Sequence, residues 1–164
     1  MKNPIEGRVG AMNARLLPNA LHGNRKCPVL PQSAALCYRI ERGRTEVLLI
    51  TTRRSRRWIV PKGWLINGLT PAETAAKEAW EEAGVEGKCS SDKLGQFTYL
   101  KQRPGQRIVL CVVDVFPLYV RSLASSYPEK TERSRKWCSR KKAASKVRSP
   151  DLAAILRSFN RFLH

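Results

Sequence analysis

A mixed α/β domain is the fold class that the sequence predicts, and three observations indicate it. The chain has 164 residues, of which 42% are hydrophobic, so its length and composition suit one domain with a sizeable core. Apolar segments with strand character lie on both sides of a segment with strong helix signals, and further helical segments follow. Strands, helix, strands and helices in that order are typical of a mixed α/β domain. We expect this domain to span residues 33–164.

Residues 1–32 have a different character. Prolines and glycines are spread through them, and five Lys or Arg residues stand against one acid, Glu6. Neither a strand period nor a helix period persists in this segment. We interpret it as a basic, largely irregular arm. Because it contains arginines and is poor in acids, a transit peptide stays open as an alternative.

Two apolar runs on either side of Arg42-Gly43-Arg44 open the domain, and they predict a hairpin-like pair of strands at 34–40 and 46–52. A third short strand is expected at 58–60, because Pro61 follows it and cannot continue a sheet ladder. Residues 62–69, with two glycines, are expected to form a loop.

A helix is predicted between Thr70 and Gly84, with signals at both ends. Thr70 suits the N-cap, Pro71 the first helical position, and Glu73 the partner in a capping box. Alanines continue the segment, and Gly84 suits the C-terminal position at which helices commonly end.

The second half of the chain predicts more strands and then helices. Residues 94–101 and 107–118 are expected to be strands joined by a tight turn at Arg103-Pro104-Gly105-Gln106. The remaining expected elements are a strand at 133–138, a short helix at 139–147 capped by Ser139, and a final helix at 151–163.

The charge of the chain indicates a polyanionic partner. Lys and Arg number 31 against 13 Asp and Glu, which gives a net charge of +18. Phosphate-rich metabolites, nucleic acids and anionic membrane surfaces all fit such a balance. The alternative is that the charge only keeps the protein soluble, but so large an excess also destabilises the compact state by self-repulsion.

The cysteine content and the hydropathy indicate the environment in which the protein works. The five cysteines are odd in number and include no CxxC pair, which argues against a disulfide framework or a zinc site. We therefore expect a reducing compartment and a cytoplasmic location. No apolar run approaches the roughly 20 residues that span a bilayer, so we expect no membrane partner.

Three glutamates near the end of the predicted helix are the candidate site. Glu78, Glu81 and Glu82 fall within about 100° of one another on a helical wheel. Their mutual repulsion and the helix dipole both disfavour this arrangement, in a chain that is poor in acids elsewhere. A solvated acidic face is the alternative, but clustered carboxylates are the ligands that Mg²⁺ or Mn²⁺ requires.

The stretch from Gly63 to Val85 resembles the Nudix box, GX5EX7REUXEEXGU, in which U is an aliphatic residue. Gly63 takes the first position, Lys77-Glu78-Ala79 takes the place of Arg-Glu-U, and residues 81–85 reproduce EEXGU. The box departs from the pattern where Leu69 replaces the early glutamate and Lys77 replaces the arginine. Residues 34–139 as a whole resemble the diphosphoinositol polyphosphate phosphohydrolase branch and its bacterial relatives.

This resemblance implies an α/β/α sandwich and a metal-dependent pyrophosphohydrolase. It implies that Glu78 and Glu82 are the first metal ligands, that Glu81 completes the cluster, and that the carbonyl of Lys62 or Gly63 is an extra ligand for Mg²⁺ or Mn²⁺. Glu78 and Glu81 are the candidates for the general base, and Lys77 would orient the carboxylates, with less rigidity than arginine. Glu129 and Glu132 are outside candidates, which we interpret first as solvated loop acids.

The resemblance and the charge together predict a substrate that carries many phosphates. The candidate phosphate-binding residues are Arg54, Arg57, Lys62, Lys101 and Arg107. Diphosphoinositol polyphosphates or dinucleoside polyphosphates fit best, and the 5′ end of RNA is the alternative substrate. A non-catalytic polyphosphate- or nucleic-acid-binding module is the alternative of another class, and Leu69 is its best support. We expect a monomer or a homodimer.

Overall fold

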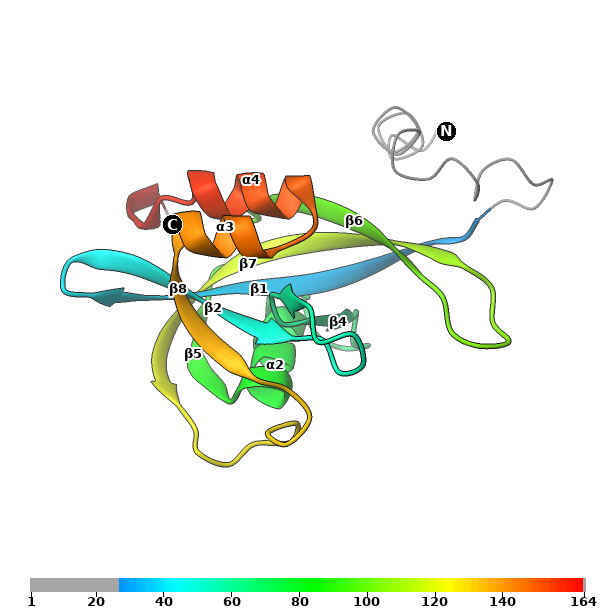
Figure 1. Ribbon diagram of the computed structural model, residues 1–164, viewed down its shortest axis with the longest axis horizontal. Helices are drawn as coiled ribbons and strands as arrows, with labels where there is room; N and C mark the ends of the chain where they lie inside the picture. The colour runs from blue at the N-terminus through cyan, green and yellow to red at the C-terminus, as the bar shows by residue number, and fades with distance from the viewer. Residues whose placement is uncertain (1–26, 164) are drawn as a thin grey trace.

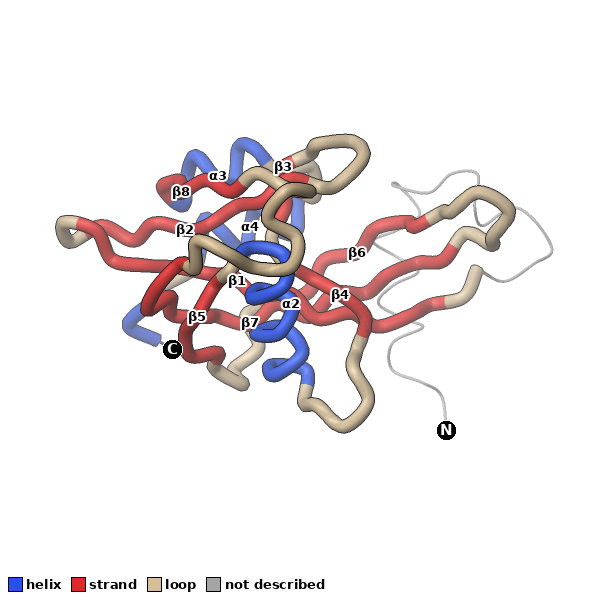
Figure 2. Tube along the Cα trace, turned by 90° about the horizontal axis from the view of Figure 1, so that it is seen from below, coloured by secondary structure: helices blue, strands red, loops and turns tan. Residues whose placement is uncertain are grey.

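One mixed β-sheet lies between two helical layers in the computed structural model, which describes residues 27–163. Helix α2 (Pro71–Ala83) covers one face, and helices α3 (Arg140–Lys146) and α4 (Pro150–Ser158) cover the other (Figure 1). Figure 2 shows the strands running between these layers. The predicted α/β/α sandwich is confirmed.

The sheet has the strand order β3-β2-β1-β7-β5, and β4, β6 and β8 pair with β1, β7 and β2 respectively. The pairing of β1 with β7 is parallel, whereas the other pairings are antiparallel, so the sheet is mixed. The strands are β1 (Val29–Glu41), β2 (Arg44–Thr51), β3 (Trp58–Ile59), β4 (Lys62–Trp64), β5 (Val85–Cys89), β6 (Gly95–Lys101), β7 (Val109–Leu123) and β8 (Arg135–Ser139).

Two buried clusters, one on each face, hold the layers together. Ala34 and Leu36 of β1 point into the cluster beneath α3 and α4. Ala35 and Cys37 alternate with them and point into the cluster beneath α2. Such alternation is the period of a strand that is buried on both faces. The small alanine side chains of α2 let the helix pack closely against the sheet. This packing fixes the distance between the glutamates of the helix and strands β1 and β4.

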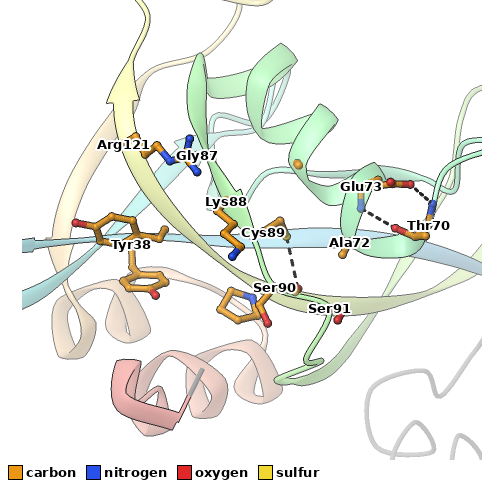
Figure 3. A pocket seen from close by; sticks show the side chains of 13 residues that line it. Tyr38, Thr70, Ala72, Glu73, Gly87, Lys88, Cys89, Ser90, Ser91 and Arg121 are labelled. Carbon is orange, nitrogen blue, oxygen red and sulfur yellow. Dashed lines mark hydrogen bonds between the residues drawn. The ribbon is translucent and has the colours of Figure 1, made fainter.

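Helix α2 begins and ends as predicted. The Thr70 hydroxyl accepts a hydrogen bond from the Glu73 amide, and the Glu73 carboxylate accepts one from the Thr70 amide, which completes the capping box drawn in Figure 3. Gly84 ends the helix with φ of 66°, in the left-handed region that favours glycine.

The other predicted elements are largely present, but several bounds differ, and β7 ends at Leu123 where 118 was expected. Residues 62–64 were expected in a loop but form β4, and β5 was not predicted. The expected helix at 151–163 ends at Ser158, because Phe159 turns its ring into the core against Tyr38, and a separate 3-10 turn, η1 (Arg161–Leu163), follows. Residues 29–32 were assigned to the arm but begin β1. Residues 1–26 of the arm lie outside the described residues.

All five cysteines are free thiols, and Cys37, Cys111 and Cys138 are buried. Among the residues described, no helix combines the length and the apolar character that crossing a membrane requires.

Candidate active site

Glu82 lies at the centre of the site, buried between α2 and the sheet. Only 7% of the residue is exposed. Its Oε2 accepts a hydrogen bond of 3.2 Å from the Lys62 amide, and its Oε1 lies 3.2 Å from the Arg133 guanidinium. Burial raises the pKa of this carboxyl, and the Arg133 charge opposes that shift. The carboxylate is therefore fixed in position by a backbone donor and a buried cation.

Glu78, one turn earlier on α2, lies against the backbone of Gly63. A Cβ atom on Gly63 would overlap the Glu78 carboxylate, so only glycine permits this approach. Strand pairing between Gly63 and Ser33 holds the glycine there. Burial, and then the neighbouring charge of Glu81, raise the pKa of Glu78 to about 7. Glu78 and Glu82 thus both face the Lys62-Gly63 segment, at which the box begins.

Glu81 is the most exposed carboxylate of the three. It forms an ion pair with Lys77, with 4.0 Å between the Lys77 Nζ and a carboxylate oxygen, and both side chains are at least a third exposed. Its backbone carbonyl accepts a hydrogen bond of 3.0 Å from the Glu129 amide. The side chain is thus held loosely, while the backbone of this turn is tied to a distant loop.

Arg133 and Glu129 join the site from the loop before β8, and the sequence alone did not single out this role. Arg133 lies 3.2 Å from Glu82 and 3.3 Å from Glu129, and its side chain is almost fully buried. Glu129 was interpreted as a solvated acid, but it faces Arg133 and its charge acts on Glu78. The four-residue spacing of Glu129 and Arg133 is visible in the sequence, but Glu82, the other partner of Arg133, lies 51 residues before it.

Arg135 of β8 holds the C-terminal end of α2. Its guanidinium donates hydrogen bonds to the carbonyls of Ala83 (2.6 Å) and Ala124 (3.0 Å) and lies over the Tyr127 ring. The last turn of the helix carries no basic residue of its own, so Arg135 supplies the cation that the helix dipole favours there. This contact fixes the turn that bears Glu81 and Glu82.

A cavity of about 580 Å³ opens beside the Lys62 side chain, and three of the five predicted phosphate-binding residues line it: Arg57, Lys62 and Lys101. The Lys62 ammonium donates to the Tyr99 hydroxyl (3.0 Å), which donates to Gln32 (2.7 Å). Burial lowers the pKa of Lys62, and Glu82 opposes that shift. Arg54 and Arg107 are exposed and are not among the lining residues.

A second cavity, of about 790 Å³, lies at the other end of α2, between that helix and strands β5 and β7 (Figure 3). Its one acidic lining residue is Glu73, and the carboxylate of Glu73 is engaged in the capping box. None of the three predicted carboxylates lines it. None of them lines the smaller cavity either, but that cavity is lined by Lys62, whose amide donates to Glu82.

A family model described as the NUDIX domain matches residues 30–159. The chain belongs to the Nudix family. The match covers the whole sandwich from β1 to the end of α4, and it includes the box on which the resemblance rested.

Among curated relatives, "Nudix hydrolase 16, mitochondrial" of Arabidopsis thaliana is 33% identical over 108 residues, which cover 64% of this chain and 59% of that protein. "Diphosphoinositol polyphosphate phosphohydrolase 3-alpha" of Homo sapiens is 38% identical over 87 residues, which cover 53% of this chain and 52% of that protein. The chain thus spans between half and three-fifths of the length of these relatives.

Solved structures share the Nudix fold. A C. elegans Ap4A hydrolase matches with a TM-score of 0.60 at 22% identity, over 83% of this chain and 99% of that chain. A NUDIX hydrolase from Nitrosomonas europaea matches with a TM-score of 0.60 at 18% identity, over 80% and 87% respectively. At these identities the likeness establishes the fold.

Helix α2 offers carboxylate oxygens, which suit a hard divalent cation. Within residues 27–163, no group of three acidic, His or Cys side chains is arranged so that it could hold a metal ion. Glu81 is instead paired with Lys77, and Glu82 with Arg133. However, Glu82 is buried and Glu78 half-buried on one face of α2, and a cation would offset the cost of removing their charges from water. Leu69, in place of the early glutamate, is exposed in the preceding loop.

Proposed function

We propose that this Nudix domain hydrolyses a pyrophosphate linkage in a polyphosphorylated substrate, with Mg²⁺ or Mn²⁺ as cofactor. The observation that carries the proposal is the position of Lys62. Its backbone amide donates to the buried Glu82 carboxylate, while its side chain lines the basic cavity. The carboxylates and the phosphate-binding surface are therefore joined by one residue.

Glu78 and Glu82 would hold the cation, with Glu81 completing the set and the carbonyl of Gly63 as a further ligand. When bound, the cation neutralises charge on the phosphate oxygens and makes water a better nucleophile. The more exposed Glu81 and its neighbour Glu78 are the groups that can accept the proton of the attacking water. Lys77 restrains Glu81, which is the positioning role that we assign to it.

Arg57, Lys62 and Lys101 would bind the phosphates that do not react. Guanidinium and ammonium groups bind phosphate through charge-assisted hydrogen bonds, and Lys62 is held in place by Tyr99 and Gln32. Lys101 is packed over the Trp64 ring, which orients a second ammonium. Arg54 and Arg107 are exposed and do not line this cavity, and we propose for them only long-range attraction of the substrate.

The names of the similar proteins favour two substrate classes. Relatives are named diphosphoinositol polyphosphate phosphohydrolases, and a structural neighbour is named an Ap4A hydrolase. Both substrates carry several phosphates, in keeping with the net charge of +18 and the four basic residues that line the cavity, Arg148 among them. We rank diphosphoinositol polyphosphates and dinucleoside polyphosphates above the 5′ end of RNA. A cytoplasmic location and a monomeric or homodimeric state remain predictions.

A substrate panel tests this proposal. Purified protein is mixed with diphosphoinositol polyphosphate, diadenosine tetraphosphate, ADP-ribose or 5′-triphosphorylated RNA, with Mg²⁺, Mn²⁺ or a chelator. We expect metal-dependent product from the first two, and none with the chelator. Faster turnover of RNA would reverse the ranking, and no turnover of any substrate would favour the non-catalytic binding module.

A further inference from the structure

A third hollow, of about 880 Å³, lies between the β1–β2 hairpin, the start of α3 and the segment after α4, and none of Glu78, Glu81 and Glu82 lines it. In Figure 1 the hairpin forms the left end of the sheet, while α3 and the segment after α4 lie above the sheet, on the face opposite α2. Among the described residues, five basic side chains and no acidic one line it: Arg44, Arg140, Lys141, Arg157 and Arg161. This hollow is therefore a concentrated positive surface that the proposed function does not use.

The positive charges of this surface are not neutralised by neighbours. Within residues 27–163, none of the five forms an ion pair with an acid. Arg140 has a structural role, because it donates to the carbonyls of Arg157 and Phe159 that end α4. Arg44 and Lys141 are exposed, and their side chains make no hydrogen bond to a described residue. Their charges remain available to an anionic partner.

An aromatic ring stands at the edge of the same hollow. Phe162 is 80% exposed, the most exposed of the large hydrophobic residues, and the Arg161 guanidinium lies 4.6 Å from its ring centre. Arg161 also has a buried nitrogen, Nη1, without a hydrogen-bond partner among the described residues. Exposed aromatics and arginines beside a basic groove are the surface on which unpaired bases stack while phosphates follow the groove.

We propose that this surface, formed by Arg44, Lys141, Arg157, Arg161 and Phe162, binds single-stranded nucleic acid. The basic side chains contact phosphates, and Phe162 stacks on a base. Helix α4 separates this hollow from the cavity beside Lys62, because Pro150 lines that cavity and Arg157 and Ser158 line this one. Nine helical residues rise about 13 Å, so the two sites are neighbours but distinct.

Binding of a fluorescently labelled, single-stranded oligoribonucleotide tests the proposal. The oligonucleotide carries a 5′ hydroxyl and therefore no pyrophosphate, so the result is independent of any hydrolysis. Fluorescence anisotropy is measured over a range of salt with the wild type, an Arg44→Ala/Lys141→Ala double variant, Phe162→Ala and Phe162→Tyr. The matched control is Lys88→Ala/Arg121→Ala, which removes two exposed charges from the cavity near β5 and β7.

We expect Arg44→Ala/Lys141→Ala to weaken binding and to lower the slope of log K against log salt by about 1.4, since each lost phosphate contact contributes about 0.7 on single strands. Phe162→Ala is expected to weaken binding at least about fivefold, while Phe162→Tyr keeps the stacking ring and the affinity. The control pair should bind like the wild type. Melting temperatures close to that of the wild type show that each variant folds.

Three outcomes would overturn the proposal. The first is equal loss of binding in the control pair, which would mean that net charge alone attracts the oligonucleotide. The second is an unchanged affinity for Phe162→Ala, which would identify a general polyanion surface without base stacking. The third is preferential binding to vesicles of phosphatidylserine and phosphatidylcholine, lost in the same variants, which would identify a membrane surface instead.

Discussion

The two ends of α2 differ in what holds them. At the N-terminal end, Thr70, Pro71 and Glu73 satisfy the first turn with groups from the helix itself. At the C-terminal end, Arg133 and Arg135 reach the helix from more than 50 residues further along the chain. The end that bears the candidate chemistry therefore depends on tertiary contacts in addition to its Gly84 cap, whereas the other end is built by local ones.

This difference explains how well the sequence predicted each end. Capping signals act within one turn, so the bounds of α2 could be read from adjacent residues. Family resemblance then supplied Glu78, Glu81 and Glu82. In contrast, Arg133 and Arg135 looked like two charges among many, because only the fold brings β8 and its loop to the helix end.

Strands β4 and β5 were missed for a related reason. Val85–Cys89 contains Gly87 and two charged residues, which carry little strand propensity, and its pairing with β7 makes it a strand. Lys62–Trp64 pairs with β1 in the same way, and this pairing places Gly63 beneath Glu78. Pairing with a neighbouring strand makes both segments strands, and a single sequence does not show which segments pair.

Arg133→Met should have the largest effect on stability. It leaves the buried Glu82 carboxylate without its cation, which costs about 3–5 kcal/mol of unfolding free energy. Denaturant unfolding measures this loss. Lys93→Met, which breaks the exposed pair with Asp114, should cost less than about 1 kcal/mol. Similar losses in both variants would mean that the C-terminal end does not depend on Arg133.

Gly84→Ala should follow in size. Alanine in the left-handed conformation costs about 1–2 kcal/mol, and its Cβ would also overlap the Tyr127 ring, so we expect about 2–4 kcal/mol in total. Gly68→Ala is the matched control near the N-terminal end, because Gly68 also has a positive φ, 86°, but a Cβ added there would meet no atom within 4 Å. Calorimetry should show the larger loss for Gly84→Ala. Equal losses would argue against packing of Tyr127 on the helix end.

Thr70→Ala tests the locally built end. Removing the N-cap hydroxyl leaves the Glu73 amide without its acceptor and should cost about 1 kcal/mol. We expect the rate of substrate turnover to stay near that of the wild type, because the cap is three turns away from Glu82. A large loss of turnover with a small loss of stability would show that the two ends are coupled.

Lys77→Ala should have the smallest effect on stability. Its pair with Glu81 is long and exposed, so the loss of unfolding free energy should stay below about 0.5 kcal/mol. The KM for substrate should change little, while kcat falls if Lys77 positions Glu81. Lys77→Arg, which restores the arginine of the box pattern, should keep or raise kcat. An unchanged kcat in both variants would remove Lys77 from the site.

Comparing Glu82→Gln with Glu73→Gln tests the central claim most directly. Both variants change one glutamate of α2 to its neutral isostere, one at each end of the helix. We expect Glu82→Gln to lower metal-dependent phosphate release by at least about 100-fold, with an unchanged fold by circular dichroism. Glu73→Gln, whose amide oxygen can still accept the Thr70 bond, should keep the activity. Full activity in Glu82→Gln would contradict the account.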